Sequence, residues 1–241
     1  MPKPFDETED PRRAFLVRAL SLGLFAAGAL GAGADSAAQL FGRRPRRLPE
    51  GQSVYDVSGP VMVNGKLIRR DARIGANDTV ETGKGAQLVF VVGADAFILR
   101  ENSRLEMGGS GVLVETLRLA TGALLSVFGR AQRKEVAGPT ATIGIRGTGL
   151  YVESEATLTY VCTCYGEVRI AASDDPSIAE TIVSRHHDAP RYVYGPSAPQ
   201  RIVPAPFKNH DDVELTLIEA LVGRTPPFSL FDEGYGSPRR Y

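Results

Sequence analysis

The chain has 241 residues, of which 28 are lysine or arginine and 28 are aspartate or glutamate. Because the formal net charge is zero, no overall positive charge steers the protein toward nucleic acid, and no nucleic-acid partner is expected. Hydrophobic residues make up 43% and charged residues 23% of the chain, a composition that excludes wholesale disorder. Only three histidines and two cysteines are present, so nitrogen- or sulfur-based metal chemistry depends on very few side chains.

Residues 1–38 predict export from the cytoplasm. Arg12 and Arg13 precede an apolar, small-residue run at 19–34, which resembles a twin-arginine signal that carries folded proteins across the bacterial inner membrane. Small residues at 32–34 offer a cleavage site. Two alternatives stay open: an ordinary secretory signal, or an uncleaved inner-membrane anchor formed by residues 19–34. We expect a periplasmic protein that contacts the membrane only if this segment stays uncleaved.

Residues 54–200 predict an all-β domain after a basic linker at 39–53. Short apolar runs recur about every eight to twelve residues, which is typical of a roll, a sandwich or an irregular β-solenoid. Asn64-Gly65 marks a tight hairpin, since both turn positions favour positive φ. The other expected strands include 88–92, 97–99, 117–119, 124–128, 142–145, 150–152, 158–162, 168–170, 182–183 and 192–194.

One helix is expected within a C-terminal segment at 201–225. Asn209 is its predicted cap, and the helix covers residues 211–222 with acidic side chains in its first turn. Its apolar stripe consists of Val213, Leu217, Ala220 and Leu221. Residues 226–241 are expected to form a tail that is extended over the surface or disordered; the alternative is that Phe228, Leu230 and Phe231 dock on the β core.

Four motifs follow one another between residues 54 and 172. They are NDTVETG at 77–83, LATGAL at 119–124, IGIRGTGLYV at 143–152 and YGEVRI at 165–170. In this order they resemble the periplasmic FecR-type domain. Small residues in the third motif suit a bulged strand, and Arg146 is expected as a buried hydrogen-bonding strut rather than an exposed anion contact.

The FecR-type resemblance implies a domain that binds or senses an envelope protein or a small ligand. Regulators of iron uptake in this family combine a cytoplasmic anti-sigma region, a transmembrane segment and this domain outside. Here only about a dozen residues precede the apolar run, too few for a folded cytoplasmic domain. We therefore expect no anti-sigma region.

The sequence also predicts a metal site. Cys162 and Cys164 would face one side of a strand, with Cα atoms about 6.5–7 Å apart. His186 and His187 follow some twenty residues later and would face opposite sides of a strand, so one of them would join the two sulfurs. The expected cofactor is one transition metal: zinc, copper or iron.

A Cys162–Cys164 disulfide and two free structural thiols are the alternatives, because exported proteins usually pair their cysteines. The chain carries no HExxH motif, no phosphate-binding loop and no nucleophile elbow, so no enzyme is predicted. The sequence favours a non-enzymatic binding or sensing domain of the cell envelope. An envelope scaffold stapled by the disulfide, or a small periplasmic metal or redox protein, is the alternative function.

Overall fold

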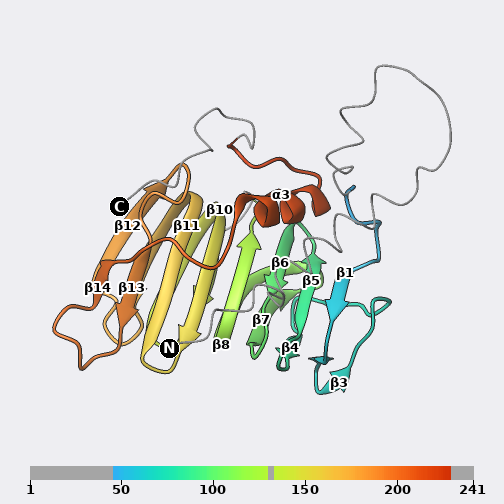
Figure 1. The fold of residues 1–241 in the computed structure, drawn as a ribbon, viewed down its shortest axis with the longest axis horizontal. Coiled ribbons are helices and arrows are strands. Elements are labelled where there is room, and N and C mark those ends of the chain that lie inside the picture. The colour runs from blue at the N-terminus through green and yellow to red at the C-terminus, as the bar shows by residue number, and fades with distance from the viewer. Residues whose placement is uncertain (1–45, 130–132, 229–241) are drawn as a thin grey trace, which may run out of the picture. The chain divides into compact units, whose positions relative to one another are not determined.

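The computed structural model describes residues 46–129 and 133–228 (Figure 1). Within these ranges the chain forms one 14-stranded sheet and one α-helix, so the expected all-β fold with a short C-terminal helix is confirmed. The predicted export signal at 1–38 and the tail beyond residue 228 lie outside the described residues. No helix in the described part of the chain is long and apolar enough to span a bilayer.

The strands follow one another as β1 (Val54–Ser58), β2 (Val61–Val63), β3 (Lys66–Leu67), β4 (Thr79–Thr82), β5 (Gln87–Val92), β6 (Asp95–Leu99), β7 (Arg104–Ser110), β8 (Leu113–Val127), β9 (Lys134–Ala137), β10 (Ala141–Glu155), β11 (Leu158–Ala172), β12 (Ala179–Ser184), β13 (Arg191–Tyr194) and β14 (Ile202–Pro204), before helix α3 (Asp212–Leu221). Their main order across the sheet is β14-β13-β11-β10-β9-β8-β7-β4-β2-β3. From β8 the sheet continues to β6, β5 and β1, and β12 pairs with β11.

Two predicted hairpins are confirmed. Asn64 and Gly65 join β2 to β3 with φ values of 50° and 75°, as a tight turn requires. Strands β5 and β6 pair across a turn at Gly93, whose φ is 61°.

The longest strands differ from the sequence prediction. β8, β10 and β11 have fifteen residues each, so the short runs predicted at 142–145 and 150–152 are parts of one strand. β10 pairs first with β9 and then with β8, and its register against β11 shifts between Arg146 and Leu150. Glycine permits this bulge: Gly166 has φ of 94°, and a Cβ there would lie 2.5 Å from Thr148 Cγ2.

Arg146 is exposed, so the predicted buried strut is wrong. Alternation along β10 places Ile143 and Ile145 in the core and turns Gly144 and Arg146 outward. Arg146 lies opposite Glu167 of β11 in the antiparallel register.

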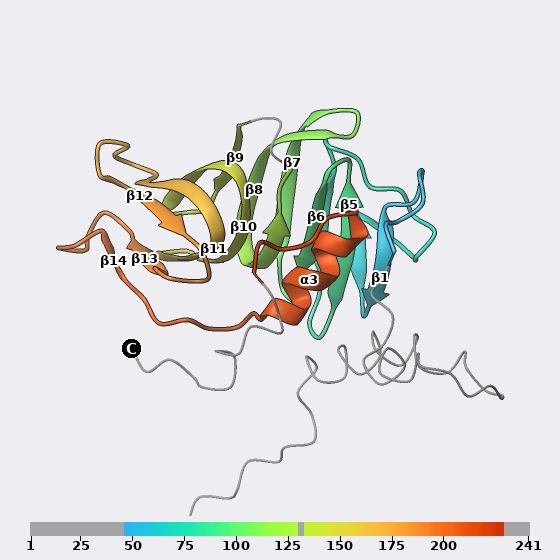
Figure 2. The same ribbon diagram turned by 90° about the horizontal axis from the view of Figure 1, so that it is seen from above.

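Both faces of the central strands are covered. On one face, Phe90, Phe97 and Leu124 belong to a single apolar cluster that runs through most of the sheet. On the other face, α3 packs on β6 and β8 and buries its own Leu215 and Ile218 (Figure 2). The helix also reaches β11, because Tyr165 of this strand donates a hydrogen bond to Glu219 of α3. Side chains on this face of β11 can therefore form a buried site.

Helix α3 starts one residue later than predicted, and its N-cap lies two residues after the predicted cap, Asn209. Asp211 is the N-cap: its carboxylate accepts from the backbone N–H of Glu214, and the Glu214 carboxylate accepts from the backbone N–H of Asp211. Asn209 instead has φ of 63° and lies outside the helix. Val213, predicted on the apolar stripe, is 44% exposed because the helix turns Leu215 and Ile218 toward the sheet.

Candidate metal centre

The site forms where β11 lacks a strand partner along one edge. β13 pairs with residues 158–161 of β11 and β12 pairs with residues 166–171, which leaves 162–165 between them. The bend that joins β12 to β13 passes this gap, and the backbone N–H of His187 donates to the carbonyl of Cys164 at 3.0 Å. The histidines therefore lie in a bend rather than on the predicted strand, and His187 has φ of 54°.

A second segment, residues 205–211, which we term the C-terminal strap, crosses the same face. Glu153 of β10 holds it by accepting from Lys208 Nζ and Asn209 Nδ2, each at 2.6 Å. The imidazole of His210 stacks on the ring of Tyr151, with 4.4 Å between ring centroids. The strap thus carries His210 onto β11, 46 residues after Cys164 in the chain.

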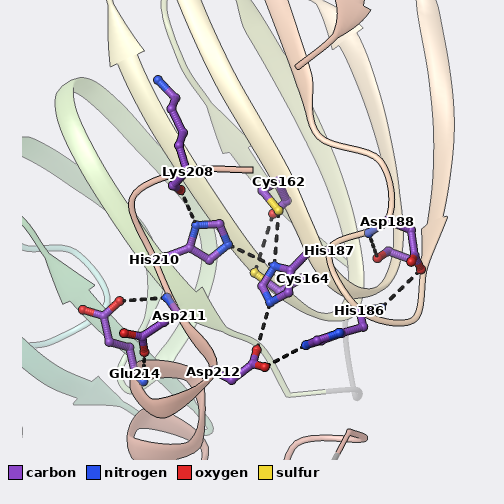
Figure 3. Close-up of polar contacts among 11 residues, drawn as sticks. Cys162, Cys164, His186, His187, Asp188, Lys208, His210, Asp211, Asp212 and Glu214 are labelled. Carbon is purple, nitrogen blue, oxygen red and sulfur yellow. Dashed lines mark hydrogen bonds and ion pairs between the residues drawn. The ribbon is translucent and has the colours of Figure 1, made fainter. Parts of the chain in front are cut away.

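Four buried side chains converge there: Cys162, Cys164, His187 and His210 (Figure 3). One donor atom from each lies within 4.8 Å of the others. Cys162 Sγ is 3.4 Å from His187 Nδ1, and His210 Nε2 is 3.1 Å from the same Nδ1. A tetrahedral zinc site with Zn–S of about 2.3 Å and Zn–N of about 2.0–2.1 Å places its donors about 3.3–3.8 Å apart. The two measured separations are close to this range, and the donors fit around one ion.

Fixed acceptors orient both imidazoles of this group. His210 Nδ1 donates to the carbonyl of Lys208 at 2.8 Å, and His187 Nε2 donates to Asp212 Oδ1 at 3.0 Å. In neutral rings, His210 Nε2 and His187 Nδ1 then carry lone pairs that face each other and the sulfurs. Facing lone pairs need a proton or a metal cation between them, and distal acceptors of this kind orient metal-binding histidines.

The surroundings of Cys162 lower the pKa of its thiol and so favour the thiolate form. Burial opposes ionisation of Cys162, but hydrogen bonding with Cys164, His187 and His210 outweighs it and lowers the pKa of Cys162 well below its ordinary value. Burial, followed by the neighbouring Cys162, raises the pKa of Cys164 well above its ordinary value. Burial also opposes the charged form of His187, yet Asp212 and Cys162 raise its pKa to about 9. Contacts within the group thus favour the charged forms of both Cys162 and His187.

The sequence identified three of these four residues. Cys162, Cys164 and His187 come together as proposed, whereas the other predicted ligand, His186, lies outside the group of four. His186 Nε2 is 2.7 Å from Asp212 Oδ2, and its side chain is 37% exposed. His210 was missed because its distance along the chain gives no spacing motif; its only signal was that it is the remaining histidine.

Neither cysteine is bridged in the structure, so the disulfide that the sequence left open as an alternative is not formed here.

The same residues also have the order of a catalytic triad. Cys162 contacts His187, and His187 contacts Asp212, in the positions of a nucleophile, its base and an orienting acid. However, Cys162 has 0% exposure, and the ring of Phe207 lies 4.6 Å from that of His187. The sulfur of Cys162 is thus enclosed by protein atoms in this structure.

No family model matches the chain, and no curated protein matches it significantly. The solved structures that match include two crystal structures, at 1.65 and 2.50 Å resolution, described as a putative anti-sigma factor from Parabacteroides distasonis. Each is 13% identical, with a TM-score of 0.43, and the match covers 57% of this chain and 62% of the other. The chain thus matches less than two thirds of their length, and a likeness of this size does not establish a function.

Proposed function

We propose that this chain is an exported, non-enzymatic binding or sensing domain of the bacterial envelope that holds one zinc ion. The ligands are Cys162, Cys164, His187 and His210. One observation carries the proposal: donor atoms from three separate segments converge within 4.8 Å, and both imidazoles are oriented by acceptors on their distal nitrogens.

Two features favour zinc over copper or iron: the types of donor atom, and the absence of an open coordination position among the four proposed ligands. Two sulfurs and two imidazole nitrogens around one point are typical of structural zinc sites, where the protein supplies all four ligands. All four side chains are buried, which suits a site with no position kept open for a substrate. The ion would fasten the strap, through His210, to β11.

Export by a twin-arginine route agrees with such a site, because this route moves proteins that have already folded with their cofactor. Thiolates bound to zinc are also protected in an oxidising compartment, where paired free cysteines would form a disulfide. The partner is an envelope protein or a small ligand. The strap is the surface whose position depends on the ion, and we place partner binding there.

Elemental analysis and a thiol count on full-length protein, purified anaerobically after export, test the proposal. We expect one zinc per chain, with both thiols resistant to alkylation until a chelator is added. Cys162→Ser and His210→Gln should lose the metal, whereas the matched control His186→Gln should retain it. Metal-free protein without free thiols would contradict the proposal and indicate the disulfide-stapled scaffold.

A further inference from the structure

The four proposed zinc ligands are buried, so an ion needs a route from solvent to reach them. A second group of potential ligands, His186, His187 and Asp212, lies on the solvent side of the site. Its donor atoms also lie within 4.8 Å of one another. Of these three side chains, His186 is the one that reaches solvent.

One imidazole belongs to both groups. His187 Nε2 lies 3.0 Å from Asp212 Oδ1 in the outer group, while His187 Nδ1 lies 3.4 Å from Cys162 Sγ in the inner group (Figure 3). Asp212 contacts His187 through one carboxylate oxygen and His186 through the other, at 2.7 Å. Nitrogen and oxygen atoms that can ligate a metal ion therefore follow one another from His186, through Asp212 and His187, to the cysteine sulfurs.

Aromatic rings cover other sides of the two groups. Phe207 lies against His187 and His210, with ring centroids 4.6 and 4.7 Å apart. Phe228 packs on His186 at 4.9 Å and on Tyr165 of β11 at 5.9 Å, so the one described residue of the three that could dock on the sheet lies against it. These rings offer no ligands to a divalent ion, whereas the edge formed by His186 and Asp212 does.

We propose that His186, His187 and Asp212 form an outer station where a divalent transition-metal ion binds before it passes to the buried donors. This inference rests on the zinc site proposed above. The outer donors are two imidazoles and a carboxylate, a set that binds zinc or cobalt without a thiolate. Thiolates hold these ions more tightly, so the ion moves inward. An ion bound at the station displaces the Nε2 proton of His187 to solvent, and Nε2 takes up a proton again when the ion moves to Nδ1. Because His187 serves both groups, the station and the buried site hold one ion in turn.

Cobalt(II) uptake by the metal-free full-length chain tests this order of events, since the thiolate-to-cobalt absorption band appears only when the ion reaches Cys162 and Cys164. In wild type, the rate of appearance should level off at high cobalt concentration, because a bound station precedes transfer. In His186→Ala, uptake should be about tenfold slower and rise linearly with cobalt concentration. Arg185→Ala, an exposed neighbour in the same bend, is the matched control and should behave as wild type.

Zinc release from the loaded protein to a chelating dye gives a second measurement, which does not require a folded metal-free chain. An on-path station accelerates both directions equally, so His186→Ala should release zinc about tenfold more slowly at unchanged stoichiometry. Uptake and release at wild-type rates in His186→Ala would overturn the station and leave the zinc site standing. A wild-type protein that binds no metal and shows no thiolate-to-cobalt band would overturn both.

Discussion

The two faces of the same strands are closed by different means. The inner face is filled mainly by apolar side chains: Phe97 stacks on Phe90 at 4.9 Å and lies edge-on to Phe128 at 6.0 Å, and a buried ion pair joins Lys134 to Asp95. The outer face is closed by the C-terminal strap and α3, which are held by directional contacts. Arg100, for example, donates to the carbonyl of Asn209 at 3.2 Å and to Glu214 at 2.8 Å. Burial of apolar side chains dominates the inner face, whereas the outer face combines directional contacts with a group of titratable side chains.

The difference has a consequence for function. The inner cluster is built from hydrophobic side chains, and the buried ion pair between Lys134 and Asp95, 2.8 Å apart, lies beside it. The outer face brings Cys162, Cys164, His187 and His210 together from three segments. We therefore assign the proposed sensing role to the outer face.

The largest expected effect comes from the inner face. Phe97→Ala should lower the free energy of unfolding by about 3–5 kcal/mol, because it leaves a cavity among fully buried side chains. Urea denaturation of wild type and Phe97→Ala, with and without a chelator, measures this loss of unfolding free energy. The loss should be the same in both conditions, and a loss that appears only without metal would contradict the independence of the two faces.

Metal removal should affect the outer face. A ligand at a hundredfold excess over its Kd stabilises the folded state by about 2.7 kcal/mol, so zinc at that excess should raise the free energy of unfolding by this amount. Hydrogen exchange should show that chelation exposes the amides of the strap and α3, while β5 and β6 stay protected. Cys162→Ser should show no further response to the chelator. Equal protection of α3 with and without metal would contradict the fastening role.

A smaller effect is expected at Glu153, which holds the strap independently of the metal. Glu153→Gln should cost about 1.5 kcal/mol, because Lys208 and Asn209 lose a charged acceptor. Burial would raise the pKa of Glu153, but hydrogen bonds from Lys208, Asn209 and Tyr151 outweigh it and hold the pKa below its ordinary value of 4.5.

The sign of the pH dependence follows from this lowered pKa. The stabilisation by Glu153 is fully present above pH 4.5 and is lost as the pH falls through the lower pKa of the folded state. The difference in unfolding free energy between wild type and Glu153→Gln should therefore shrink in acid. A difference that stays constant down to the acid transition would show that the charge of Glu153 does not hold the strap.

Local patterns in the sequence were sufficient for much of the fold. Asn64-Gly65 and the apolar runs on either side of the turn at Gly93 specified hairpins and strands, because turn geometry and short hydrophobic runs are local properties. The long strands were not predicted: bulges such as that at Gly166 resemble strand ends when only the sequence is visible.

The metal centre was predicted only in part for a similar reason. Cys162 and Cys164 form a local motif, but His210 reaches them through tertiary contacts of the strap with Tyr151 and β10. The alternation rule also assigns one face of β11 to solvent, and α3 and the strap, which cover that face, lie far along the chain. Histidines in an irregular bend follow no strand periodicity, which is why His186 and His187 could not be distinguished.

The smallest expected effect lies at Arg146, where the FecR-type motif favoured a buried strut. Because Arg146 is exposed, Arg146→Ala should change the free energy of unfolding by no more than about 0.5 kcal/mol. The adjacent Ile145→Ala is the matched control: its side chain is buried in the inner cluster, so it should cost about 2–5 kcal/mol. Urea denaturation of both variants measures the contrast. A loss above about 1 kcal/mol for Arg146→Ala, the size expected when buried acceptors lose their donor, would show that the guanidinium supports the bulge from within. The inner face would then hold a further buried charge besides the Lys134–Asp95 ion pair.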